Sequence, residues 1–134
     1  MLDGEASLPF REGSFARVLV DAPCSGTGTL RHNPEIRWRI TAPDILELSE
    51  RQRQILTEAS HVVKPGGRLI YSTCSVEPEE NEAVVRALVE GRDDFEPLTL
   101  PVRESLLTST GAARTWPHRD NTDGFFVAAF ARRL

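Results

Sequence analysis

The feature that most constrains the fold is a pair of short apolar segments separated by one long helical pattern. Residues 16–20 (ARVLV) and 68–73 (RLIYST) are rich in β-branched and large apolar side chains, which is typical of buried strands. Between them, residues 41–63 place apolar side chains at helical spacing. A strand, a helix and a second strand form a crossover, which joins parallel strands with right-handed sense in nearly every case. We therefore expect two parallel strands.

Local residues mark both ends of the first expected helix. Thr41 and Asp44 stand three positions apart, as in a capping box, and Pro43 suits a first turn. Residues 64–67 (KPGG) end the helix because proline and glycine interrupt helical structure. The helix is thus expected to begin near Thr41, after the loop that follows the first strand, and to end just before Lys64.

A second helix is expected after the second strand. Pro78 suits its first turn, and Gly91 marks its end. Glu79, Glu80 and Glu82 lie where the positive end of the helix dipole favours carboxylates. The helix should therefore run from about Pro78 to Gly91.

The rest of the chain completes one domain over residues 1–134. A chain of 134 residues is long enough for one hydrophobic core. Residues 95–100 are a third expected strand, residues 101–123 are expected to be irregular, and residues 125–130 (FFVAAF) form a last apolar strand. The class is α/β.

The two cysteines of the chain come directly after the two expected parallel strands. Cys24 follows the first strand in a turn-rich stretch, and Cys74 follows the second. In open α/β sheets, ligands bind outside the carboxyl ends of the strands. If the strands are neighbours, both thiols therefore face one cleft, although 50 positions separate them.

Two thiols at a cleft fit several kinds of chemistry. They suit covalent catalysis, a redox disulfide or a soft metal, and a lone buried cysteine is commonly just a small apolar side chain. No histidine stands at metal spacing beside Cys24 or Cys74, so a zinc site is not expected. Both cysteines lie in polar turns, which favours a chemical function over simple packing.

Charge and hydropathy predict a cytoplasmic protein, and the overall charge does not indicate a nucleic-acid partner. The net charge is −4, and only Lys64 among the 16 basic residues is a lysine. Arginine pairs bidentately with phosphate and stacks on bases, so local arginine clusters are the place to look for RNA contact. No apolar run approaches the roughly 20 residues that cross a bilayer, and residues 1–10 do not resemble a signal peptide.

Three stretches carry a resemblance to a known family. Residues 20–28 (VDAPCSGTG) and 71–82 (YSTCSVEPEENE) resemble the two signature motifs of the Sun (Fmu) family of RNA cytosine-5 methyltransferases, to which the bacterial small-subunit rRNA methyltransferase B belongs. Residues 123–126 (DGFF) resemble its closing motif. The resemblance implies the C-terminal half of a Rossmann-like class I methyltransferase sheet, with a final antiparallel strand.

The resemblance also implies a reaction and the residues that perform it. S-adenosylmethionine is the cofactor, and a methyl group goes to C5 of a cytosine in RNA, with rRNA the expected substrate. Cys74, in the Thr-Cys motif, is the nucleophile that adds to C6 of the base. Cys24, in the Pro-Cys motif, assists removal of the C5 proton and release of the product. DNA cytosine-5 methyltransferases use the Pro-Cys cysteine as nucleophile instead.

Two acidic residues are implied near the cofactor. Asp21 is expected between base and cofactor, where it supports protonation of the cytosine N3 and touches the methionine portion. Asp3 corresponds to an acidic position near the adenine. The alternative for Asp21 is a turn residue that caps nearby N–H groups.

Two basic and aromatic clusters are candidates for RNA contact. The first follows the Cys24 loop, and its composition suits phosphates and unpaired bases. A solvated loop in which Trp38 covers the core is the alternative. The first cluster consists of Arg31, His32, Arg37, Trp38 and Arg39, and the second of Arg114, Trp116, His118 and Arg119.

The family pattern includes elements that these residues do not show. A glycine-rich cofactor turn and an acidic residue after the second strand are expected upstream, together with an RNA-binding domain. We therefore expect the chain to be inactive alone, and to pair its first strand with the missing half or with another copy. A noncatalytic RNA-binding or complementing fragment and a thiol redox protein are the alternative functions.

Overall fold

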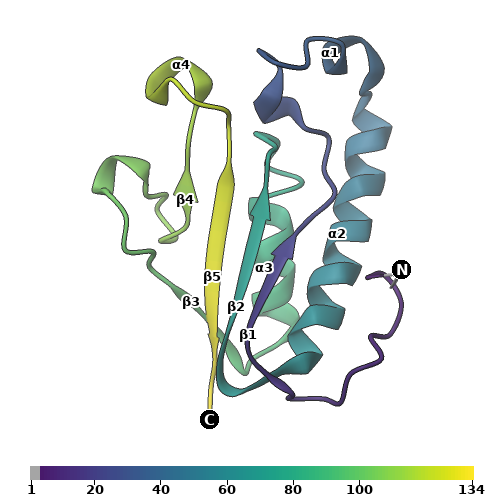
Figure 1. Ribbon diagram of the computed structural model, residues 1–134, viewed down its shortest axis with the longest axis vertical. Coiled ribbons are helices and arrows are strands. Elements are labelled where there is room, and N and C mark those ends of the chain that lie inside the picture. The colour runs from purple at the N-terminus through teal and green to yellow at the C-terminus, as the bar shows by residue number, and fades with distance from the viewer. Residues whose placement is uncertain (1–3) are drawn as a thin grey trace.

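The expected crossover forms the centre of the molecule. In the computed structural model, which describes residues 4–134, β1 (Phe15–Asp21) leads through α2 (Ala42–Val62) to β2 (Val63–Thr73) (Figure 1). The two strands are neighbours and run parallel, with Leu19 opposite Ile70. The prediction of two adjacent parallel strands joined by one long helix is thus confirmed.

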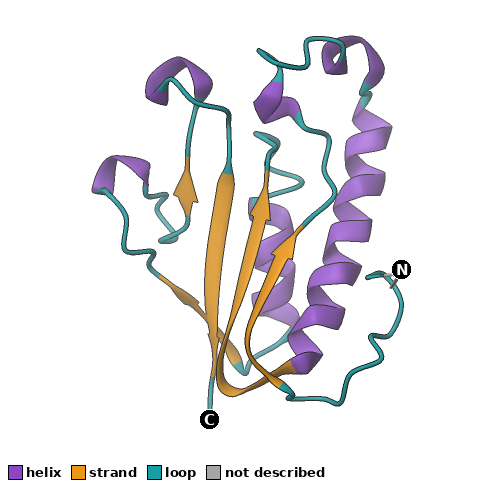
Figure 2. Ribbon diagram, in the orientation of Figure 1, coloured by secondary structure: helices purple, strands orange, loops and turns teal. Residues whose placement is uncertain are grey.

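The sheet has a mixed arrangement. Its order is β1-β2-β5-β3, where β3 is Phe95–Leu98 and β5 is Phe126–Arg132. The last strand, β5, runs antiparallel to both of its neighbours (Figure 2). The short β4 (Ala113–Arg114) pairs with the beginning of β5. The final antiparallel strand matches the expected fold.

The core lies between the sheet and two helices that cover one of its faces. Those helices are α2 and α3 (Glu82–Gly91), which pack against each other. Inward side chains alternate along the strands with outward ones, as the pleat requires. The largest buried apolar side chains of this core are Tyr71, Phe95, Phe126, Phe130, Leu56 and Leu69. Burying each contributes about 1.5–3 kcal/mol.

The opposite side of β1 is open. Among residues 4–134, β1 pairs only with β2, so its outer edge has no strand partner. Leu19 points away from the core and is 65% exposed. An exposed edge with apolar side chains favours association with a further strand.

Three expected boundaries differ from the structure. At the start of α2 the expected capping box of Thr41 and Asp44 is present. The next helix, α3, begins at Glu82, later than the expected start at Pro78. β2 begins at Val63, and the KPGG residues are accommodated by a register shift opposite β1. The stretch 101–123 is not irregular throughout, because it contains a short strand and two short helices. These are β4, η2 (Glu104–Leu106) and α4 (Pro117–Asp120).

Loops from three parts of the chain meet beyond the carboxyl ends of β1 and β2. The short helices η1 (Thr27–Thr29), α1 (Ile36–Arg39) and α4 all lie at this end of the sheet (Figure 1). Gly28 donates to the Cys74 carbonyl at 2.9 Å, and its own carbonyl accepts from the Gly124 amide at 2.7 Å. A Cβ on Gly28 would lie 2.7 Å from the Cys74 oxygen and closer still to that of Gly124, so only glycine fits.

Candidate active site

The fold brings the two cysteine thiols into contact. Cys24 lies in the loop after β1 and Cys74 in the loop after β2, and their Sγ atoms are 3.2 Å apart. Both cysteines are free and only partly buried. The convergence expected from the crossover is therefore present, and neither cysteine residue is fully buried.

The two thiols differ in acidity. The hydrogen bond with Cys74, burial and repulsion from the Cys74 thiolate raise the pKa of Cys24. The hydrogen bond from Cys24 lowers the pKa of Cys74 to about 7, against burial and the negative charges of Asp21 and Glu80. Cys74 is thus the thiol that ionises first, and Cys24 keeps its proton and donates it. The thiolate is the nucleophilic form of cysteine.

A buried carboxylate joins the two cysteine loops. Glu80 is fully buried and accepts hydrogen bonds from the amide of Ser25 at 2.8 Å and from its hydroxyl at 2.6 Å. The Ser75 hydroxyl and the side-chain amide of Gln52 also donate to this carboxylate. Ser25 and Ser75 each follow a cysteine, so Glu80 fixes the chain directly after both thiols.

Neighbouring side chains extend this network. Asn81 accepts a hydrogen bond from the Thr73 hydroxyl at 2.6 Å and donates one to the Ser75 carbonyl at 2.8 Å. It thereby holds the residue before Cys74 and the residue after it. Gln52 of α2 donates to the Pro23 carbonyl at 2.8 Å, next to Cys24. Among the described residues the Gln52 Oε1 atom has no partner, but the other polar groups of this network are paired, and such pairing holds a loop in one conformation.

The structure corrects the expected position of Glu80 and adds Gln52 to the site. Glu80 is expected in the first turn of a helix, at the positive end of its dipole, whereas it lies in the turn before α3 and is fully buried. One pattern points to Gln52: it stands four residues after Leu48 and four before Leu56, within the inward stripe of α2. A polar side chain in that stripe needs buried hydrogen-bond partners.

Asp21 lies at the carboxyl end of β1. Its side chain is exposed on the sheet face opposite the helices and accepts a hydrogen bond from Ser72 at 3.0 Å. An exposed carboxylate beside the thiol pair fits the ammonium group of an amino-acid moiety such as the methionine portion of S-adenosylmethionine. Asp3, the other expected cofactor residue, lies outside the described residues.

The five expected RNA contacts do not line a single hollow. Arg31 and His32 both contact Asp123, each at 3.3 Å. Arg37, Trp38 and Arg39 form the exposed helix α1. Trp38 is 83% exposed, so it does not cover the core.

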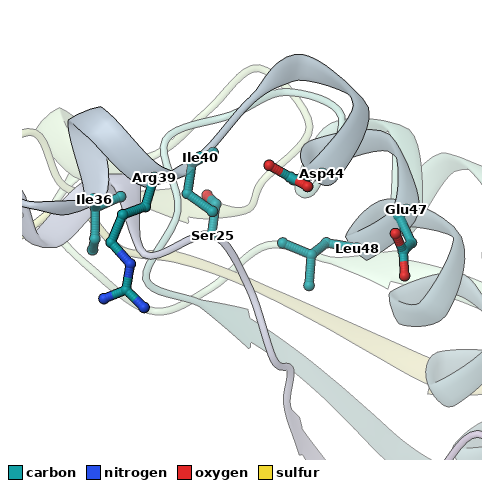
Figure 3. A pocket seen from close by; sticks show the side chains of 7 residues that line it. All are labelled: Ser25, Ile36, Arg39, Ile40, Asp44, Glu47 and Leu48. Atoms are coloured by element: carbon teal, nitrogen blue, oxygen red, sulfur yellow. The ribbon is translucent and has the colours of Figure 1, made fainter.

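Arg39 faces a hollow of its own. This hollow of about 440 Å³ lies between α1 and the start of α2, and Asp44 and Glu47 also line it (Figure 3). Two carboxylates make this hollow a poor phosphate site. The structure therefore separates Arg39 from Arg31 and Arg37, which line a different groove.

Comparison with known proteins identifies the family. The family model described as "16S rRNA methyltransferase RsmB/F" matches residues 3–131. The chain belongs to the RsmB/F methyltransferase family. This confirms the resemblance to the Sun (Fmu) proteins.

Members and structural neighbours of the RsmB/F family cover nearly the whole chain. The probable ribosomal RNA small subunit methyltransferase B of Bacillus subtilis is 37% identical over 134 residues, which is 96% of this chain and 30% of the relative. Its counterpart in Shewanella oneidensis is 43% identical over 114 residues, covering 85% of this chain and 26% of that protein. The chain thus spans less than a third of the length of either relative.

Solved structures support the fold of this RsmB/F family member. The structure of NSun6 from Pyrococcus horikoshii with SFG has a TM-score of 0.80 and 25% identity, covering 99% of this chain and 34% of that one. A methyltransferase homologue from the same organism has a TM-score of 0.73 and 37% identity. The match covers 90% of this chain and 40% of that one. The Rossmann-like methyltransferase sheet inferred from the sequence is confirmed.

Proposed function

We propose that this chain forms the catalytic-cysteine half of an S-adenosylmethionine-dependent RNA cytosine-5 methyltransferase. The observation that carries the proposal is the contact between Cys24 and Cys74, 3.2 Å apart at the carboxyl ends of β1 and β2. The lowered pKa of Cys74 supports its role as the nucleophile. The names of the curated relatives support RNA methylation in general.

The chemistry begins with the thiolate of Cys74. Its sulfur adds to C6 of the cytosine, and the electron pair of the C5–C6 double bond then makes C5 nucleophilic. After C5 has gained the methyl group, the C5 proton must leave, the double bond must re-form and the C6–sulfur bond must break. Cys24, next to Cys74, assists this proton removal and the release of product; it accepts the C5 proton only after its own proton has passed to solvent. Asp21 supports protonation of the base at N3.

S-adenosylmethionine supplies the methyl group on a sulfonium when it is bound. The NSun6 structure holds SFG, an analogue of this cofactor. Asp21 is proposed to meet the methionine portion, and Asp3 is proposed for the adenine end. We propose that further cofactor contacts come from a part of the fold outside these 134 residues, and that the chain is inactive without it.

The proposed substrate is rRNA and the proposed location is the cytoplasm. The relatives' names refer to ribosomal RNA of the small subunit. Among residues 4–134, no helix is long and apolar enough to span a bilayer. Arg31, His32, Arg37, Trp38 and Arg39 are the proposed RNA contacts.

Covalent trapping tests the mechanism. The protein that contains this chain is incubated with S-adenosylmethionine and labelled RNA carrying 5-fluorocytidine, which lacks the proton that has to leave C5. The wild type should form an RNA adduct that survives denaturing electrophoresis. The Cys74→Ala variant should form none, and Cys24→Ala should still form it.

The outcomes separate the parts of the proposal. An adduct that depends on Cys24 instead of Cys74 reverses the two roles. No adduct with the wild type, under conditions where it binds cofactor and RNA, refutes the covalent mechanism. A dithiol redox protein is the second candidate, because the sulfurs are close enough to oxidise to a disulfide. Such a protein would form no covalent bond with RNA.

A further inference from the structure

A groove opens beside the thiol pair on the side of α4. It has a volume of about 480 Å³, within the range of about 300–1,000 Å³ that is common for small-ligand sites. Thr27 and Val76 form part of its lining, and the Val76 amide donates to the Thr27 hydroxyl at 3.2 Å. These residues follow Cys24 and Cys74 by three and two positions. The groove is therefore built on the same two loops as the thiols, but neither thiol lines it.

An aromatic side chain that is held in place lines the groove on the α4 side. The Arg114 guanidinium lies 5.0 Å from the centre of the Trp116 ring and 5.3 Å from that of Phe126, which belongs to the core. The Trp116 amide donates to Asp120 at 2.7 Å, and Pro117 continues the same wall. An indole fixed in this way offers a stacking surface without a large loss of side-chain freedom on binding.

Positive charge lines the other side. Arg31 and Arg37 both face the groove, and His118 lies beside Trp116. Asp123 offsets part of the Arg31 charge, whereas Arg37 forms no ion pair within the described residues. Within residues 4–134 no carboxylate lines this groove, in contrast to the hollow at Arg39 with Asp44 and Glu47 (Figure 3).

We propose that this groove binds an unpaired nucleotide directly adjacent in the RNA to the cytidine that is methylated. Its base stacks on Trp116, and Arg37 contacts a neighbouring phosphate. Proteins commonly bind single-stranded RNA in this way, with aromatic rings against the bases and basic side chains along the backbone. Neither thiol lines the groove, so its occupant is not the base that Cys74 attacks, and because the groove shares the two cysteine loops, that occupant is a neighbour of the target base. The inference rests on the proposed RNA substrate and adds a second base-binding site to it.

Fluorescence polarisation with short RNA tests the inference without requiring catalysis. The probe is a fluorescein-labelled single-stranded heptamer with a central cytidine, and two further probes carry an abasic residue on its 5′ or its 3′ side. Trp116→Ala should weaken binding of the intact probe by roughly tenfold, the scale of one base–aromatic stack. Against one of the two abasic probes, Trp116→Ala should cause no further loss, because the base that stacks is already missing.

Matched variants separate stacking from unfolding and from general charge. Trp116→Phe keeps an aromatic face and should restore most of the affinity. Arg37→Ala should weaken the binding of all three probes. It should also reduce the slope of log affinity against log salt concentration by about 0.7, the value for one lost phosphate contact. The control Arg86→Ala removes an exposed arginine of α3 and should change affinity less than twofold.

Two results would overturn the inference. One is binding of the intact RNA by Trp116→Ala within twofold of the wild type. The other is an equal loss on Trp116→Ala with every probe, which would mean that no adjacent base contacts the ring. Because covalent trapping depends on Cys74 and not on Trp116, a working trap with either of these results rejects the groove alone. A trap that fails while the abasic pattern holds rejects the mechanism alone.

Discussion

Cys24 and Cys74 carry the same functional group, yet their surroundings divide the work between them. One hydrogen bond couples them, and it has opposite effects on the donor and the acceptor. Cys24 retains its proton because it donates to Cys74 and is desolvated, and Cys74 gains negative charge because it accepts. Because either sulfur could donate in this contact, the surroundings divide the roles: Cys24 is the more deeply buried of the two thiols, and burial opposes its ionisation.

We predict that iodoacetamide reacts with Cys74 faster than with Cys24, with a half-maximal rate near pH 7. The rate rises with pH because only the thiolate reacts and the pKa of Cys74 is lowered to about 7. In Cys24→Ala the hydrogen bond is lost, so the midpoint should move upward towards the ordinary value near 9. Mass spectrometry of the Cys74 peptide over a pH series measures both midpoints.

Cys24→Ser serves as the matched control for this shift. Its hydroxyl retains a donor, so the Cys74 midpoint should stay closer to the wild type than it does in Cys24→Ala. Preferential alkylation of Cys24, or an unchanged midpoint in Cys24→Ala, would contradict the assignment of Cys74 as the more acidic thiol.

At the scale of elements, the loops after β1 and β2 are held by the turn that precedes α3. Glu80 receives donors from Ser25, Ser75 and Gln52, which belong to three different segments. The Tyr71 hydroxyl of β2 also donates to the Glu80 carbonyl at 2.7 Å. The separation of the two thiols is therefore set by this turn as well as by the strands.

We predict that Glu80→Ala lowers the free energy of unfolding by about 2–4 kcal/mol, because several buried donors lose their acceptor. Glu80→Gln retains one acceptor oxygen and should cost less. Urea unfolding gives the values, and the exposed neighbour Glu79→Gln is the control, expected within about 0.5 kcal/mol of the wild type. Loosened loops should also slow the formation of a Cys24–Cys74 disulfide under diamide. Full stability of Glu80→Ala would show that the carboxylate is not structural.

The sequence predicts those elements whose causes are local. Thr41 and Asp44 lie within one turn, so four consecutive residues are enough to predict their capping box. The crossover is equally legible because its handedness and direction follow from general chain geometry. Glu80 was misplaced because its partners lie up to 55 positions away, and nothing within its own turn distinguishes it from the exposed Glu79. The short β4 and the register shift at KPGG likewise depend on strands paired at long range.

At the scale of the whole molecule, the sheet has helices on one face and an open edge at β1. Leu19 is 65% exposed on that strand, and Phe15 at its start is 38% exposed. An unpaired edge with apolar side chains is a template for another strand. We propose that a part of the methyltransferase fold outside these 134 residues, or failing that a second copy of the chain, occupies this edge.

We predict that the 134-residue chain associates as its concentration rises and that Leu19→Lys weakens this association. A charge on the edge opposes strand pairing while leaving the buried face of β1 unchanged. Multi-angle light scattering over a dilution series measures the change in mass. Leu46→Lys is the control, because Leu46 is 63% exposed on α2 and lies away from β1. A stable monomer throughout, or an equal effect of both variants, would contradict a role for this edge.

The tight backbone contact of Gly28 with Cys74 and Gly124 limits which sequence changes related proteins can accept. The backbones of the three signature stretches touch there, with no side chain between them to absorb a change. A loop grafted from a distant homologue would therefore bring a mismatch unless its two companions came with it. The outer surface of α2, by contrast, is free to drift residue by residue. Descent should consequently preserve the three stretches as a linked set while the segments between them vary.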